Sequence, residues 1–141
     1  MEIMIRKVMS VDHDRLFVLV TQFATSFQPQ RAAFAQAAQH LLRDESAWWA
    51  VAECAGTVVG YCLGFVHYTF YANGRVAWVE EIMVEPRARQ QGVGRALMVA
   101  FEQWAVEHDA KLVALATRRA TPFYQAIGYE ASATYFRKVI G

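Results

Sequence analysis

The chain has 141 residues, and we expect residues 1–141 to form one domain with a buried core. Hydrophobic residues make up 55% of it and charged residues 19%, which excludes a disordered chain, and the formal net charge of +1 argues against nucleic acid as a partner. No apolar run reaches the roughly 18 to 20 residues of a membrane span, and the N-terminus does not resemble a signal peptide. Cys54 and Cys62 lack the spacing of zinc ligands. These features predict a cytoplasmic protein that binds no metal, membrane or nucleic acid.

The first half of the chain predicts a strand, two helices and a β-hairpin. Hydrophobic and polar residues alternate at the N-terminus, as in a strand, and the next two apolar patterns have helical spacing. Two segments rich in Val, Trp and Tyr follow and predict a β-hairpin. We therefore expect strands over 2–8, 46–54 and 57–71, a helix from Ser10 or Asp12, and a second helix after Pro29.

The second half continues with a strand, a glycine loop and a helix. Asn73-Gly74 is a strong hairpin-turn signal that precedes a strand, and Pro86 ends that strand. Further patterns predict a helix to about Asp109, a buried strand, a short helix and one or two closing strands. The expected segments after the turn are 75–84, 93–109, 111–117, 121–127 and 129–140. This order predicts an α/β (α+β) fold with a mixed sheet and helices on its faces.

The glycine loop before the third helix has the features of an anion site. Gly92 and Gly94 stand at the expected start of the helix, and Arg87, Arg89 and Arg95 surround them. The first N–H groups of a helix lack internal partners and carry partial positive charge, and glycine lets a phosphate approach the backbone. The pattern is neither a dinucleotide fingerprint nor a P-loop. Taken alone, the glycines are more typical of an ordinary strand-to-helix turn.

Two longer sequence motifs, one of which contains the glycine loop, resemble motifs of a known family. The stretch "EEIMVEPRARQQGVGRALM" resembles the signature of the GNAT superfamily of acetyl-CoA-dependent N-acetyltransferases, with Arg89-Gln90-Gln91-Gly92-Val93-Gly94 at its centre. A second family element is matched by "TRRATPFYQAIGY", in which Thr117 stands where the family has Asn. The resemblance covers nearly the whole chain. It implies a GNAT-like domain with a mixed, mostly antiparallel sheet of about six to seven strands and about four helices.

The resemblance also implies how the chain holds acetyl-CoA. The pyrophosphate is expected on backbone N–H groups from the loop, and the pantetheine arm on the backbone of the preceding strand, like an added strand. The second element is expected to complete the site, and Arg118 and Arg119 either assist the 3′-phosphate or are solvated. The expected cofactor-binding residues are Ile82, Met83, Val84, Arg89, Gln90, Gln91, Gly92, Val93, Gly94, Arg95, Thr117, Ala120, Phe123 and Tyr124.

Catalysis is assigned to one tyrosine and to one of two glutamates. Tyr124 lies where the family has its general acid, which assists the departing thiolate. Glu80 and Glu81 are adjacent on a strand and point to opposite faces, so only one of them can face the amine, and a local bulge can change which. We favour Glu80 for recognising or deprotonating the amine, with Glu81 as the alternative. A backbone N–H near Met83 or Val84 is expected to bind the oxyanion.

The sequence predicts an enzyme but leaves its acceptor open. The expected reaction is direct transfer of acetyl from acetyl-CoA to the primary amine of a small molecule or of a peptide N-terminus. The alternative is a non-catalytic module that binds CoA in regulation or assembly. The high apolar content and the aromatic end "TYFRKVI" also predict a homodimer.

Overall fold

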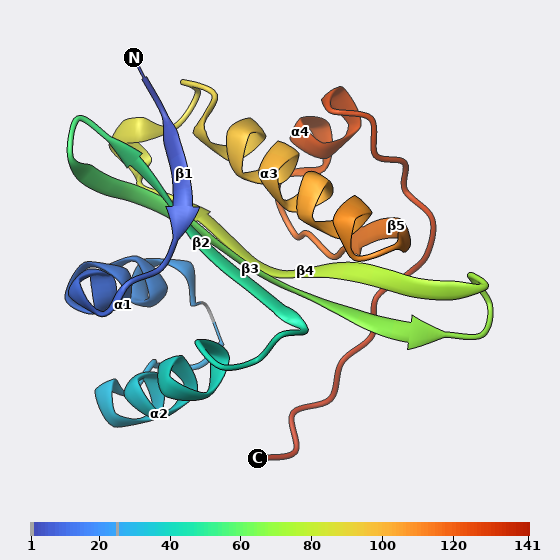
Figure 1. The fold of residues 1–141 in the computed structure, drawn as a ribbon, viewed down its shortest axis with the longest axis horizontal. Coiled ribbons are helices and arrows are strands. Elements are labelled where there is room, and N and C mark those ends of the chain that lie inside the picture. The colour runs from blue at the N-terminus through green and yellow to red at the C-terminus, as the bar shows by residue number, and fades with distance from the viewer. Residues whose placement is uncertain (1, 25) are drawn as a thin grey trace.

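A computed structural model describes residues 2–24 and 26–141 as one sheet with two helices on each face (Figure 1). The strands are β1 Met4–Lys7, β2 Ala47–Cys54, β3 Thr57–Thr69, β4 Gly74–Val84 and β5 Ala110–Leu115. The helices are α1 His13–Phe23, α2 Arg31–Leu41, α3 Val93–Glu107 and α4 Thr121–Ala126, with short 3₁₀ turns over Ser10–Asp12 and Pro86–Ala88. Helices α1 and α2 cover one face of the sheet, and α3 and α4 cover the other.

The sheet is mixed, as the sequence predicts. Its strand order is β1-β2-β3-β4-β5; neighbouring pairs are antiparallel up to β4, and β5 runs parallel to β4. The parallel pair is connected through α3, because two parallel strands need a crossover. The α+β class and the helices on both faces are confirmed.

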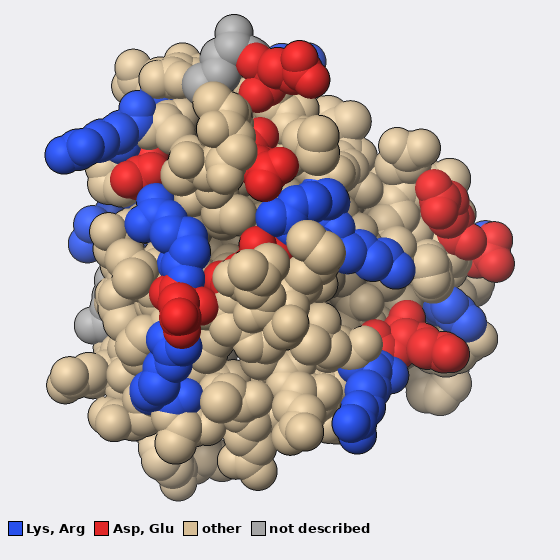
Figure 2. Space-filling view, turned by 60° about the vertical axis from the view of Figure 1, so that its left-hand side comes forward, with Lys and Arg blue, Asp and Glu red and all other residues tan. Residues whose placement is uncertain are grey.

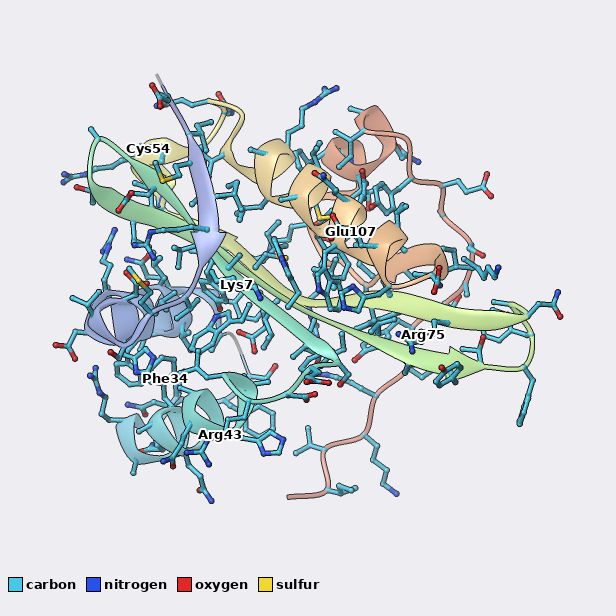
Figure 3. All side chains as sticks on the ribbon, viewed as in Figure 1. Lys7, Phe34, Arg43, Cys54, Arg75 and Glu107 are labelled. Carbon is cyan, nitrogen blue, oxygen red and sulfur yellow. The ribbon has the colours of Figure 1, made fainter. Side chains whose placement is uncertain are left out.

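Two apolar cores fill the spaces between the sheet and the helices on its two faces. The α3-side core contains Leu97, Met98 and Phe101 of α3, which are fully buried against the sheet. The α1-side core contains Leu16 and Leu19 of α1, with sheet residues of the opposite face. On that side the ring centres of Phe34, on α2, and Trp49, on β2, lie 6.2 Å apart, and this contact connects α2 to the sheet. Phe34 is labelled in Figure 3. Because both faces of the sheet are covered, the position of each β4 side chain decides which core it meets.

The expected closing strands over 129–140 are wrong. In the described part of the chain no strand follows α4, and residues 130–141 form an exposed extended segment that descends past the sheet in Figure 1. Among the described residues the sheet therefore has five strands and not six to seven. High β-propensity makes a segment compatible with a sheet, but a strand exists only where a neighbour satisfies its N–H and C=O groups.

Candidate active site

Strand β4 has an open edge where it separates from β5. The parallel ladder runs from Arg75 paired with Ala110 to Val79 paired with Leu115, and there β5 ends. Strand β4 continues to Val84 and is bonded to β3 on its other side. Within the described residues nothing pairs with Glu80–Val84 on the β5 side, which we call the open edge. An open edge of this kind offers backbone N–H and C=O groups to an extended ligand.

The loop after β4 brings helix N–H groups to the end of this edge. Gln90 and Gly92 have left-handed backbone conformations, with φ of 61° and 89°, and α3 begins immediately afterwards. The N–H groups of Val93, Gly94 and Arg95 belong to the first turn of α3, and the described residues offer them no backbone acceptor. These donors and the helix dipole make the loop a favourable position for an anion.

The two glycines of the loop serve different purposes. A Cβ on Gly92 would meet only Ile3, at 4.0 Å, so the space in front of it is free, while its positive φ favours glycine. A Cβ on Gly94 would lie 3.3 Å from the Phe123 ring and 3.9 Å from Val84 Cγ2. A side chain at Gly94 would therefore crowd the Phe123 ring whether or not a phosphate is bound. The same contacts show that the end of β4, the start of α3 and α4 meet at one point.

The loop arginines are not equivalent. Arg89 Nε donates to the Val84 carbonyl at 3.0 Å, so its side chain lies back over the end of β4. Arg87 and Arg95 are exposed, and their side chains have no hydrogen-bond or ion-pair partner in the described part of the chain. On the face shown in Figure 2 basic and acidic side chains are interspersed. Arg87 and Arg95 are thus the loop cations still free to bind an anion.

Tyr124 is buried in the α3-side core with a free hydroxyl. It lies near Cys62 of β3, and its ring contacts those of Phe123 and Tyr129, with ring centres 5.0 and 5.9 Å away. No hydrogen bond from its hydroxyl to a described residue is found. Burial is the main reason that the pKa of Tyr124 rises to about 12. The group is therefore protonated at neutral pH and available to donate to a ligand.

A bulge in β4 decides where the two glutamates point. Leu63 lies opposite Glu81 and Gly64 lies opposite Val79, so Glu80 is an extra residue. Val79 belongs to the α3-side core, whereas Met83 belongs to the α1-side core, so the alternation of side chains changes phase across the bulge. Glu80 is exposed, and Glu81 faces the α1 side.

Glu81 is held by a tyrosine that the sequence did not single out. The hydroxyl of Tyr61, fully buried in the α1-side core, donates to Glu81 Oε1 at 2.7 Å. Burial raises the pKa of Glu81, the Tyr61 hydrogen bond opposes that rise, and the nearby Glu80 charge adds to it. Burial together with the Glu81 charge raises the pKa of Tyr61 above its usual value, so Tyr61 remains a donor. The Tyr61–Glu81 hydrogen bond depends on the register of β3 against β4, and no local sequence pattern predicts it.

The second motif is built around the turn into α4. Thr117 Oγ1 accepts a hydrogen bond from the Ala120 N–H at 3.1 Å, so Thr117 stabilises this turn. Arg118 and Arg119 are exposed. The structure thus groups Ile82–Val84, the loop and α4 around the open edge, with Tyr124 on its α3 side and Glu81 on its α1 side.

Comparison with known proteins identifies the class. Residues 13–129 match the model of the acetyltransferase (GNAT) family, so the chain belongs to this family and the resemblance of its motifs is confirmed. An uncharacterised N-acetyltransferase of Bacillus subtilis, YhfO, is 29% identical over 84 residues, which cover 57% of this chain and only 56% of that relative.

Solved structures share the fold across the whole chain. A protein from Bacillus halodurans described as a transcriptional regulator is 20% identical with a TM-score of 0.88, covering 99% of this chain and 100% of that one. Glucosamine-6-phosphate N-acetyltransferase from Arabidopsis thaliana is 16% identical with a TM-score of 0.85 and full coverage of both chains. The aminoglycoside acetyltransferase AAC(6')-Iy, solved with a CoA-containing bisubstrate analogue, is 20% identical with a TM-score of 0.82, covering 99% and 100%. At these identities the likeness establishes the fold.

Residues 2–24 and 26–141 contain neither a membrane-spanning helix nor a cluster of metal-binding side chains. No helix there is both long and apolar enough to cross a membrane. No group of three or more His, Cys, Asp or Glu side chains within those ranges is arranged to hold a metal ion.

Proposed function

We propose that the protein is an N-acetyltransferase that moves an acetyl group directly from acetyl-CoA to a primary amine of a small molecule or of a peptide N-terminus. The observation that carries this proposal is the open edge of β4, which leads directly into the donor-rich loop at the start of α3. Family membership supports the same reaction class. We propose a cytoplasmic protein that uses no metal.

Different residues of the site would bind different parts of acetyl-CoA. The backbone of Ile82, Met83 and Val84 would bind the pantetheine arm, and the N–H groups from Gln90 to Arg95 would bind the pyrophosphate. Arg89 now donates to the Val84 carbonyl and would have to turn outward to reach a phosphate. Thr117, Ala120 and Phe123 would border the arm near α4 and hold the segment that carries Tyr124.

The chemistry then follows from the groups on either side of the edge. The neutral amine nitrogen attacks the thioester carbon, a C–N bond forms, and the tetrahedral intermediate collapses by breaking the C–S bond. A backbone N–H near Met83 or Val84 would stabilise the oxyanion. The nitrogen loses one proton to a carboxylate or to water, and the CoA thiolate leaves with the electron pair of the C–S bond.

Tyr124 would assist the leaving group mainly by hydrogen bonding. A thiol has a pKa of about 8.5, so complete proton transfer from a phenol with a pKa of about 12 is uphill. A hydrogen bond from the free hydroxyl still stabilises the thiolate as negative charge develops on sulfur. The thiolate is then protonated from water.

For the carboxylate, the structure favours Glu81 over our first preference, Glu80. Tyr61 occupies Oε1 of Glu81, fixes the side chain and leaves Oε2 for an ammonium group or a bridging water. Glu80 is exposed in the bulge. Because alkyl ammonium groups have pKa values of roughly 10, Glu81 would bind the ammonium form and accept one proton from it, through water, so that the neutral nitrogen can then attack the thioester.

A panel of amines tests this function. Purified protein is incubated with acetyl-CoA and each amine, and release of free thiol is followed; the Gly92→Asp variant, made to weaken cofactor binding, supplies the background. Thiol release that depends on both the amine and wild-type protein is expected. The panel should include aminoglycosides and amino sugars, because similar folds act on these classes.

The alternative is a non-catalytic CoA-binding module in regulation or assembly. It is favoured by the structural neighbour described as a transcriptional regulator. Calorimetric binding of acetyl-CoA without turnover of any amine would support this alternative. Absence of cofactor binding by the folded protein would contradict both functions.

A further inference from the structure

An aromatic pair lies on the part of the sheet that extends past α1 and α2. In Figure 1 strands β3 and β4 continue well beyond these two helices. Phe65 and Trp78 are opposite each other in the β3–β4 ladder, and both are half-buried. Their neighbours Gly64 and Val79 face α3, since a Cβ on Gly64 would meet the Phe101 ring and Val79 belongs to the α3-side core. Because side chains alternate along a strand, the aromatic pair lies on the α1 side.

Glu81 lies on the same face, next to this pair. Its partner across the ladder is Leu63, which precedes Phe65 by two residues on β3, a separation of roughly 6.7 Å along the strand. Tyr61 holds the carboxylate from the other direction, and Trp49 on β2 is the second ladder partner of Leu63. A molecule whose ammonium group binds Glu81 can therefore place its body on aromatic and aliphatic side chains.

The strands around Glu81 carry almost no other charge. Segments 47–51, 61–65 and 78–83 contain no Lys or Arg, and Glu80 and Glu81 are their only acidic residues. A carboxylate or phosphate on the acceptor would find no cation on these strands and would be repelled by Glu81. The charge pattern thus favours an acceptor without an anionic group.

The same pattern argues against an acceptor with several positive charges. Two carboxylates at α1 and at the end of β4 are already paired with arginines. These pairs are Glu85 with Arg15 and Asp14 with Arg31. A second or third ammonium group would meet only the solvated Glu80 or the apolar surface, where an unpaired charge is costly. One oriented carboxylate suits one ammonium group.

We propose that the acceptor is a small arylalkylamine, with one positive charge, an aromatic body and no anionic group. The ammonium group binds Glu81, and the ring lies on Leu63, Phe65 and Trp78, where aromatic contacts add to apolar burial. Trp78 and Phe65 are thus specificity-determining residues that do not touch the reacting atoms. This inference rests on the proposed acetyl transfer and names the acceptor of that reaction.

The reaction of such an amine balances without another reactant. The C–N bond to the acetyl carbon forms and the C–S bond breaks, and the thiolate leaves with the electron pair. The ammonium group gives up two protons in all, one through Glu81 to water and one after the attack. The thiolate takes one proton from water, so the products are a neutral amide, CoA thiol and one released proton.

Four amines compared by thiol release with acetyl-CoA test the acceptor class. They are 2-phenylethylamine, ethylamine as the amine without a ring, kanamycin as a polycation and glucosamine 6-phosphate as an anionic amine. We expect kcat/KM for 2-phenylethylamine to exceed each of the others at least about 30-fold. The last two represent the acceptor classes of proteins with a similar fold.

Two variants test the aromatic pair. Trp78→Leu is expected to reduce the ratio of kcat/KM for 2-phenylethylamine to that for ethylamine about 10-fold, because it removes the ring beneath the acceptor but spares the amine site. Phe65→Leu should change the ratio in the same direction and serves if the first variant does not fold. The matched control is Trp104→Leu on α3, which packs against the α3-side core and should leave the ratio unchanged.

The outcomes separate this inference from the reaction itself. Equal or higher kcat/KM with kanamycin or glucosamine 6-phosphate would overturn the arylalkylamine class and leave acetyl transfer intact. An unchanged ratio in the folded Trp78 and Phe65 variants, or an equal change in the Trp104 variant, would overturn the role of the aromatic pair. Absence of thiol release with every amine would contradict the proposed function and this inference with it.

Discussion

The two sides of the open edge hold titratable side chains in contrasting states. On the α3 side Tyr124 is buried without a hydrogen-bond partner among the described residues, and on the α1 side Glu81 is held by Tyr61 at 2.7 Å. Burial raises the pKa of both groups. The difference lies in their contacts: the Tyr124 hydroxyl is free to donate, whereas the Glu81 carboxylate is held in one orientation. The following variants test this contrast.

The largest effect is expected on the Tyr124 side. Tyr124→Phe keeps the ring and its packing but removes the hydroxyl, so kcat and kcat/KM should both fall by about 10² to 10⁴ while acetyl-CoA affinity stays nearly constant. Steady-state kinetics with an amine found in the panel and calorimetry with acetyl-CoA measure the two quantities. Turnover at the wild-type rate would remove Tyr124 from the mechanism.

On the Glu81 side, Glu81→Gln should reduce kcat/KM for the amine by roughly 100-fold, because the amide can neither take a proton nor attract the ammonium group. Its neighbour provides a matched control. Glu80→Gln changes the same atoms at an exposed position and should alter the rate by about twofold at most. The reverse order of the two effects would restore Glu80 as the functional carboxylate.

The loop between β4 and α3 is expected to affect the reaction through its binding of acetyl-CoA. Gly92→Asp places a negative charge where the phosphate is proposed to lie, and we expect acetyl-CoA affinity to fall about 10- to 100-fold. Gly92→Ala imposes the same backbone strain at φ of 89° without the charge and should cost less. Equal affinities of the two folded variants, measured by calorimetry, would mean that no phosphate approaches Gly92.

The smallest effect is expected from Tyr61→Phe. Loss of one hydrogen bond should reduce kcat/KM about 2- to 10-fold. The hydrogen bond favours the ionised carboxylate, so its removal raises the pKa of Glu81 further, and the acid limb of the pH–rate profile should move to higher pH.

Tyr129→Phe is the control for that shift, since it removes another tyrosine–glutamate hydrogen bond, to Glu102, on the opposite side of the sheet. If Tyr61 is only a packing residue, its variant will lose stability or rate without any movement of the acid limb. The same movement in the Tyr129 variant would also exclude a specific role for Tyr61.

The sequence by itself determined the local pieces of the site. The order of Pro86, the loop glycines and the apolar helix pattern is set by φ preferences and by helix periodicity, which act within a few residues. For the same reason the strand-to-helix turn, the class of the fold and the family were predictable before the structure. The positions of Tyr124 and of the loop followed from motifs of this local kind.

Only the tertiary structure decided the contacts between distant segments. The bulge opposite Leu63 and Gly64 directs Glu81 to the α1 side, and Tyr61 holds it there; both depend on the register of two strands, which many residues set together. The segment after α4, residues 130–141, shows the same limit. Its β-propensity is a property of the sequence, but whether it becomes a strand depends on pairing with a neighbouring edge, and in the described chain residues 130–141 pair with no strand.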